Sequence, residues 1–163
     1  MLCVIRRKMI VLKSLDGVID LPGLKARIPS ELLGLLKEAA PWTSYVALTP
    51  DGIAVGACAF KSRPTKMKEV EMAYLTFPEF EKRGYGTAMA RRLFEIADAS
   101  GEVERVVAQT LREENSSVHI CRQLGFAFDG DVVDSEDGLV WRWSKQTSLT
   151  WRCSDRMAGL GKG

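Results

Sequence analysis

The stretch PEFEKRGYGTAMARRLFEIA, residues 78–97, places a charged loop and two glycines directly in front of a predicted helix. A helix N-terminus leaves backbone N–H groups unpaired and carries a partial positive charge, so it attracts anions. Gly84 and Gly86 have no Cβ to keep a phosphate away from these groups. Lys82 and Arg83 add full positive charge beside them. The loop therefore predicts a pyrophosphate-binding site.

The glycine spacing does not match the other common phosphate loops. A dinucleotide-binding fold needs GxGxxG after the first strand of a parallel unit, but Met89 takes the third glycine position here. The Gly-Lys pair of a P-loop occurs only at residues 161–162, without the Ser or Thr that should follow it. For Gly84 and Gly86, a tight turn that binds nothing stays open as the alternative.

The elements that position this loop can be read from hydrophobic periodicity and turn residues. We expect a short strand near residues 10–11, a helix from Ser30 that stops at Pro41, and a hairpin over residues 45–60 with its turn at residues 49–52. The remaining predicted elements are a strand at residues 69–77, a helix at 84–98, a buried strand at 103–111, a helix at 115–125, and strands at 126–133 and 139–143.

Length and composition predict one globular domain and exclude several classes of protein. The chain has 163 residues, 46% of them hydrophobic, and a net charge of +2 with no basic run, so a nucleic-acid surface is not expected. Cysteines are scattered at positions 3, 58, 121 and 153 beside a single histidine, which argues against a zinc site or a disulfide framework. No signal segment or membrane span is predicted, so we expect a cytoplasmic domain at residues 1–144 with a mobile tail at 145–163.

Two segments resemble the GNAT superfamily of N-acetyltransferases. The superfamily signature is a strand that ends V-x-P, a loop Q/R-x-x-G-x-G/A and a helix. This chain has TFP at residues 76–78, EKRGYG at residues 81–86, and a predicted helix after them. The segment TLREENSSVHICRQLGF, residues 110–126, is similar to one in the branch that contains the ribosomal-protein N-terminal acetyltransferases. The resemblance runs in the expected order from about Tyr45 to Trp143.

What the resemblance implies is an α+β fold: a mixed, mostly antiparallel sheet of six to seven strands, splayed at its fourth and fifth strands and flanked by helices. Acetyl-CoA is the implied cosubstrate, with no metal, and an extended ligand rich in amides can occupy such an open sheet edge. In family terms, the backbone of Tyr74, Leu75 and Thr76 would pair with the pantetheine arm, which Asn115 would contact through its side chain. The pyrophosphate would be bound by the N–H groups of Lys82, Arg83, Gly84, Tyr85, Gly86 and Thr87.

Two positions depart from the family pattern. Glu81 stands where the family has Gln or Arg, and so places a negative charge near the phosphates. Cys121 stands where many members have a tyrosine that protonates the departing thiolate. By resemblance to the closer branch, Ser117 is the first candidate for this donor and Cys121 the second. A first-turn helix residue and a small core residue are the structural alternatives for these two positions.

Acetyl transfer also needs a base, because only an uncharged amine attacks a thioester. Glu69 and Glu71 alternate onto one face of the strand that would bind the cofactor, and we expect Glu71 to act through water. Two solvated carboxylates are the alternative interpretation. We expect His119 to have a structural role or to lie on the surface. We expect the aromatic residues of the strands to lie in the core.

The sequence thus predicts an N-acetyltransferase that moves an acetyl group from acetyl-CoA to a primary amine by direct transfer in a ternary complex. The identity of the amine stays open, as does the choice between a monomer and a homodimer. A catalytically silent acyl-CoA-binding module is the first alternative, because of Glu81 and the missing tyrosine. A nucleotide-binding domain is the second, and it rests only on the glycine pair.

Overall fold

A computed structural model describes residues 8–17 and 22–150 of the chain. These residues form strands, helices and short 3-10 turns. The order is β1 (Val11–Ser14), η1 (Leu15–Gly17), η2 (Lys25–Arg27), α1 (Ser30–Gly34), η3 (Leu35–Lys37), β2 (Ser44–Leu48), β3 (Ala54–Phe60), β4 (Glu69–Thr76), η4 (Pro78–Phe80), α2 (Tyr85–Ser100), β5 (Arg105–Thr110), α3 (Ser116–Gln123), β6 (Ala127–Asp134) and β7 (Gly138–Gln146).

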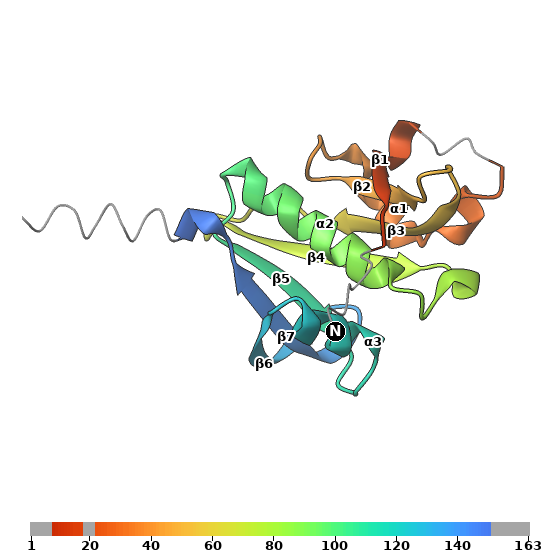
Figure 1. The fold of residues 1–163 in the computed structure, drawn as a ribbon. Coiled ribbons are helices and arrows are strands. Elements are labelled where there is room, and N and C mark those ends of the chain that lie inside the picture. The colour runs from red at the N-terminus through yellow and green to blue at the C-terminus, as the bar shows by residue number, and fades with distance from the viewer. Residues whose placement is uncertain (1–7, 18–21, 151–163) are drawn as a thin grey trace, which may run out of the picture.

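The strands form one seven-stranded sheet in the order β1-β2-β3-β4-β5-β7-β6. Neighbouring strands are antiparallel except β4 and β5, which are parallel and are joined by α2. One core cluster packs α2 and α3 against the sheet, and a second packs α1 and the chain before it against the other face (Figure 1). The predicted α+β class and mixed, mostly antiparallel sheet are therefore confirmed.

β4 and β5 separate after a short paired stretch, which confirms the predicted splay. The two strands pair only between Glu69–Glu71 and Arg105–Val107. Beyond this point β4 stays beside β3 as far as Thr76, and β5 stays beside β7 as far as Thr110. The backbone of β4 past Glu71 therefore has no strand partner on its β5 side, which leaves an open edge inside the sheet.

The helix from Ser30 is shorter than predicted. α1 ends at Gly34, and η3 continues only to Lys37. Gly34 weakens the helix at its middle, and the hydroxyl of Ser44 donates a 2.6 Å hydrogen bond to the carbonyl of Leu32. The expected N-cap role of Ser30 is also wrong, because Ser30 is the first helical residue and Pro29 occupies the cap position without a side-chain hydrogen bond.

Other elements follow the sequence closely. The hairpin turns where predicted, with Gly52 at a φ of +89° and its N–H donating to the carbonyl of Thr49. α2 begins after Gly84 and ends at Gly101, both in the left-handed region that favours glycine. The expectation that strand aromatics fill the core is confirmed for Tyr45, Phe60 and Trp143, and Trp42, just before β2, is also buried. Trp141 on β7 is only partly buried.

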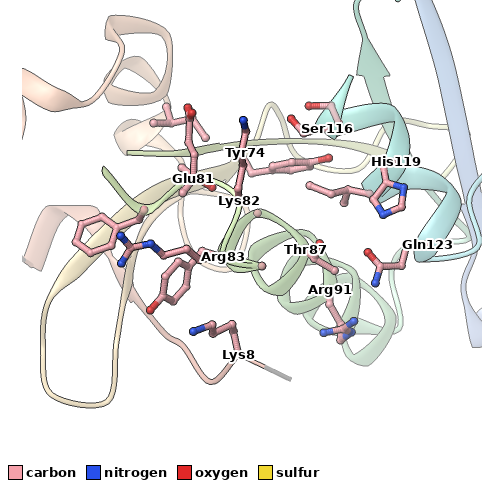
Figure 2. A pocket seen from close by; sticks show the side chains of 18 residues that line it. Lys8, Tyr74, Glu81, Lys82, Arg83, Thr87, Arg91, Ser116, His119 and Gln123 are labelled. Atoms are coloured by element: carbon pink, nitrogen blue, oxygen red, sulfur yellow. The ribbon is translucent and has the colours of Figure 1, made fainter. Parts of the chain in front are cut away.

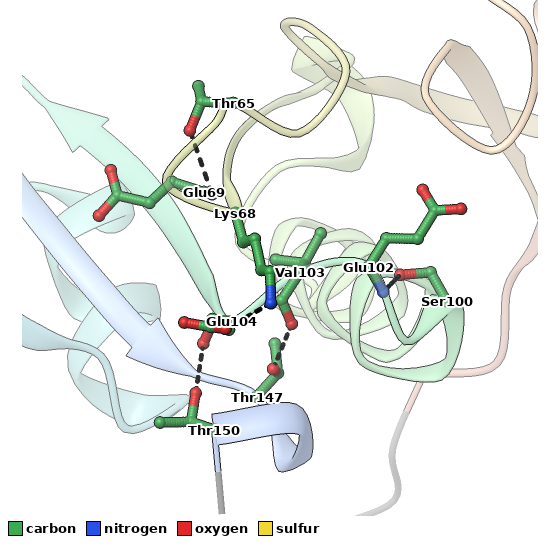
Figure 3. Close-up of polar contacts among 9 residues, drawn as sticks. All are labelled: Thr65, Lys68, Glu69, Ser100, Glu102, Val103, Glu104, Thr147 and Thr150. Atoms are coloured by element: carbon green, nitrogen blue, oxygen red, sulfur yellow. Dashed lines mark hydrogen bonds and ion pairs between the residues drawn. The ribbon is translucent and has the colours of Figure 1, made fainter. Parts of the chain in front are cut away.

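The C-terminal strand extends past the predicted domain end at residue 144. β7 continues to Gln146, and Thr147 is buried and donates a side-chain hydrogen bond to the carbonyl of Val103. The Thr150 hydroxyl donates to the carbonyl of Glu104 at 2.9 Å (Figure 3). The expected boundary therefore lies inside a strand, and residues 151–163 of the expected tail lie outside the described residues.

No helix within residues 8–17 and 22–150 combines the length and the hydrophobicity needed to cross a membrane.

Candidate active site

A pocket of about 660 Å³ opens where β4, the loop before α2 and the first turns of α2 and α3 meet (Figure 2). β4 contributes its last three residues, next to the open edge of the sheet. Most of the predicted cofactor-binding residues line this pocket: Tyr74, Leu75, Thr76, Lys82, Arg83, Gly84, Tyr85, Gly86 and Thr87. The fold thus brings together two stretches of chain that the sequence identified separately.

The loop before α2 is shaped by residues with unusual backbone geometry. Lys82 has a φ of +58° and Gly84 a φ of +87°, so the chain turns sharply between η4 and the helix. A Cβ on Gly86 would lie 3.0 Å from Cδ1 of Ile120 and 3.4 Å from Oγ1 of Thr76. Glycine at this position therefore allows α2, α3 and the end of β4 to approach one another closely.

The pocket holds positive charge that the described part of the chain leaves largely without ion-pair partners. Arg83 and Arg91 line it, and neither forms an ion pair with a carboxylate among the described residues. Every other arginine within residues 8–17 and 22–150 does form one. Lys8 and Lys82 also line the pocket, and Glu81 is the one carboxylate among its described lining residues. Such a site suits a ligand with several negative charges.

Aromatic rings hold two of these cations in place. The guanidinium of Arg83 lies 5.8 Å from the centre of the Phe80 ring, and the ammonium of Lys8 lies 5.3 Å from the centre of the Tyr85 ring. The two rings meet edge to face, with their centres 6.1 Å apart. Cation–π contacts of this kind position a charge without neutralising it.

Tyr74 brings a phenol into the pocket from β4. Figure 2 shows its ring extending toward α3. Burial raises the pKa of this phenol above its usual value and the nearby Cys121 adds to the shift, whereas an interaction with Ser117 partly opposes it. The phenol therefore stays protonated at neutral pH.

The two predicted proton donors of α3 lie in different environments. Ser117 is half-buried and lines the pocket. Cys121 is fully buried in the core cluster and is not among the residues that line the pocket. Burial raises the pKa of the Cys121 thiol to about 11, so it is a neutral thiol at physiological pH.

The two glutamates of β4 lie outside the pocket and are paired with basic residues. Glu71 forms a 2.7 Å ion pair with Lys61 and accepts a 3.3 Å hydrogen bond from the amide of Gln109. Glu69 lies between Arg105 and Arg142, at 3.2 Å and 2.9 Å. By strand alternation, these carboxylates lie on the opposite face of β4 from the Tyr74 ring.

Asn115 is placed at the start of α3 and outside the pocket lining. Its side-chain oxygen accepts a 3.1 Å hydrogen bond from the N–H of Val118 and so caps the helix. The structure thus shows that Asn115 has a structural role as the N-cap of α3. A contact of Asn115 with the pantetheine arm stays a prediction.

Several residues that line the pocket are not among the predicted site residues. Arg91 is one turn of α2 beyond Thr87, and Gln123 is one turn of α3 beyond His119, so helical periodicity from the identified residues would have found them. His119, which was expected to be structural or on the surface, is exposed and also lines the pocket. Lys8 comes from the chain before β1, and no sequence signal connects it to the loop.

No group of three or more His, Cys, Asp or Glu side chains placed to hold a metal ion occurs in the part of the chain that the structure describes.

Comparisons with known proteins agree with this fold. A family described as "Acetyltransferase (GNAT) domain" matches residues 25–127. The search of curated proteins gave no significant match.

Solved structures share the fold at low sequence identity. Mutant forms of the spermidine/spermine N-acetyltransferase SpeG from Vibrio cholerae align with a TM-score of 0.57 and 16% identity, over 68% of this chain and 67% of that one. The same enzyme in complex with CoA and spermine gives a TM-score of 0.57 and 15% identity, over 66% and 67%. A GNAT-family acetyltransferase from Bacillus anthracis gives 0.56 and 15%, over 63% and 65%. Because the family match covers more than half of the chain and the splayed sheet agrees with it, the chain belongs to the acetyltransferase (GNAT) domain family and is an acetyl-CoA-dependent acyltransferase.

Proposed function

We propose that the protein transfers the acetyl group of acetyl-CoA directly to a primary amine, within a ternary complex. The observation that carries this proposal is the pair of arginines, Arg83 and Arg91, that face the pocket without a carboxylate partner among the described residues. Coenzyme A is extended, rich in amides and polyanionic, and this pocket offers an open strand edge next to unneutralised cations. A small uncharged ligand would make no use of these charges.

The residues that would hold coenzyme A come from two elements. The backbone of Tyr74, Leu75 and Thr76 offers the edge of β4 to the amides of the pantetheine arm, in the manner of an added strand. The N-terminus of α2 offers its free N–H groups to the pyrophosphate, with Lys82 and Arg83 beside them. Asn115, at the start of α3, would contact the pantetheine arm through its side chain.

The proton for the departing thiolate would come from the hydroxyl groups between β4 and α3. The sequence identified Ser117 and Cys121 for this role, and the structure adds the phenol of Tyr74, which also lines the pocket. We infer that Tyr74 gives its proton to the sulfur as the C–S bond breaks, and that Ser117 donates a hydrogen bond to the phenolate that remains. The buried Cys121 would support this pair by packing.

The attacking amine must lose a proton, and Glu71 remains our candidate for the base. Glu71 would take the proton of the amine through a water molecule located at the open gap between β4 and β5. Its 2.7 Å ion pair with Lys61 holds the carboxylate in a fixed position beside this gap.

The acceptor class is the least constrained part of the proposal. The structural neighbour SpeG was solved with spermine, so polyamines belong in the first acceptor panel. The negative charges of Asp134 and Asp137 lie near Lys61, on the Glu71 side of the sheet, and would favour a cationic acceptor there. N-terminal peptides belong in the panel because of the resemblance at residues 110–126, although the comparisons do not support the ribosomal-protein branch.

The test is a calorimetric titration of the full chain with acetyl-CoA, followed by an assay for free CoA with the amine panel. We expect saturable binding that Gly86→Glu abolishes, because the new side chain would enter the crowded junction of α2, α3 and β4. Gly34→Glu is the matched control, since a Cβ at Gly34 meets no atom within 4 Å and α1 lies outside the pocket. Absence of binding by the unmodified chain would overturn the proposal, and binding without turnover of any amine would favour the silent module.

A further inference from the structure

The polar residues of the pocket fall into two groups. Lys8, Lys82 and Arg83 surround the loop before α2, whereas Arg91, His119 and Gln123 lie farther along α2 and α3. In Figure 2 the side chains of Arg91 and Gln123 lie together beside α2 and α3, apart from Lys8 and Arg83. A pyrophosphate bound at the loop would use only the first group.

Helix geometry explains why the second group is separate. Arg91 lies on α2 five residues beyond Gly86, which corresponds to about 7.5 Å along the helix axis. His119 and Gln123 are four residues apart on α3 and so share one face. Since α2 and α3 meet closely at Gly86 and Ile120, these faces border the same end of the pocket. The second group is therefore attached to helix positions farther from the loop than those that would hold the pyrophosphate.

Among the residues that the structure describes, no carboxylate pairs with Arg91. The adjacent Arg92 pairs with Glu95 at 2.9 Å, but Arg91 forms no ion pair among the described residues. Glu81, which is the one carboxylate among the described residues that line the pocket, belongs to the loop group. His119 and Gln123 add hydrogen-bonding groups across from Arg91. A guanidinium with such neighbours is well suited to a phosphate monoester.

We propose that Arg91, with His119 and Gln123, forms a second anion site that takes the 3′-phosphate on the ribose of coenzyme A. This inference rests on the proposed function, because it assigns a part of the same cosubstrate. It implies that the enzyme distinguishes coenzyme A from donors that lack this phosphate. Acyl groups on a carrier protein, whose phosphopantetheine has no ribose, would therefore be poor donors.

The experiment compares CoA with 3′-dephospho-CoA by calorimetric titration of the full chain at low ionic strength. We expect the unmodified protein to bind CoA about tenfold more tightly, which is the effect of one good charge-assisted contact. Arg91→Gln should remove this preference by weakening CoA binding while leaving the affinity for dephospho-CoA unchanged, which also shows that the variant is folded. The matched control Arg92→Gln, in which the Glu95 ion pair is lost instead, should keep the preference.

The outcomes separate this inference from the proposed function. Equal binding of the two ligands by the unmodified protein would overturn the second site and leave the proposed cosubstrate standing. Loss of the preference in Lys8→Gln but not in Arg91→Gln would assign the 3′-phosphate to the loop side and overturn the assignment to Arg91. Binding of neither ligand would overturn both proposals.

Discussion

The phenol of Tyr74, at the end of β4, lies beside the hydroxyl of Ser117, in the first turn of α3, at the open end of the gap between β4 and β5. The chain has cysteine where a tyrosine is frequent in the family, yet a phenol still reaches this region from a different element. Tyr74 therefore combines two positions in the proposed chemistry: its backbone lies on the cofactor edge, and its side chain lies where a leaving thiolate would need a proton.

Tyr74→Phe should lower kcat by about 100-fold and leave the affinity for acetyl-CoA nearly unchanged, because it removes only the donating hydroxyl. Steady-state kinetics with the amine that gives turnover measures both quantities. Since the pKa of Tyr74 is raised, the phenol remains protonated as the pH passes its usual value of about 10, and the rate should show no loss from this group below that pH. Ser117→Ala should give a smaller loss of kcat. An unchanged kcat in Tyr74→Phe would show that the phenol only fills space.

Glu71→Gln tests the base, and Lys61→Met is its matched control. If Glu71 accepts the proton of the amine, the glutamine variant should lose kcat by roughly 100-fold, whereas Lys61→Met should keep most of the activity. The pH dependence of kcat/KM in the two variants checks the interpretation. Equal losses in both would mean that the ion pair matters only for holding β4 in place.

Asn115→Ala should reduce the free energy of unfolding by about 1 kcal/mol, because it removes the hydrogen bond to the N–H of Val118 that caps α3. Asn115→Asp should retain the cap and most of the stability. Urea unfolding gives the stabilities, and titration with acetyl-CoA gives the affinities of the same two variants. A stable Asn115→Asp protein with weakened acetyl-CoA binding would instead support the predicted contact with the pantetheine arm.

Cys121→Ala separates a packing role from a catalytic one. We expect kcat to be retained and the free energy of unfolding to fall by about 1 kcal/mol, because a buried side chain is shortened. A large loss of kcat in a stable Cys121→Ala protein would restore the catalytic role that the sequence suggested.

The pKa of Cys121 adds a pH dependence with a defined sign. Burial raises this pKa from 9.0 to about 11, so the thiol contributes fully to stability below pH 9. Between pH 9 and 11 the unfolded chain loses the proton before the folded one does, and stability falls. Unfolding curves at increasing pH should therefore show a shallower decline for Cys121→Ala than for the unmodified protein. Parallel declines would contradict the burial of this thiol.

Local signals were enough to predict most elements of the fold. Gly84 and Gly101 mark the ends of α2, Asn115 caps α3, and the Asp-Gly turn defines the hairpin, because each needs a backbone conformation or a hydrogen bond that few residue types supply. The same signals located the loop before α2. The predicted length of α1 was wrong. Its leucines indicate a longer helix, whereas packing against the sheet and the hydroxyl of Ser44 end the helix early.

The sequence by itself thus determined the order of the elements, the family resemblance and the position of the loop that is predicted to bind anions, all of which depend on residues close together in the chain. Only the tertiary structure decided which residues share the pocket. It placed the phenol of Tyr74 beside α3, brought in Lys8 from the chain before β1, and put Cys121 in the core. It also left Arg83 and Arg91 without a carboxylate partner within residues 8–17 and 22–150. The physical reason is that side-chain direction, burial and ion pairing depend on contacts between segments far apart in sequence, and a single sequence carries no local signal for these contacts.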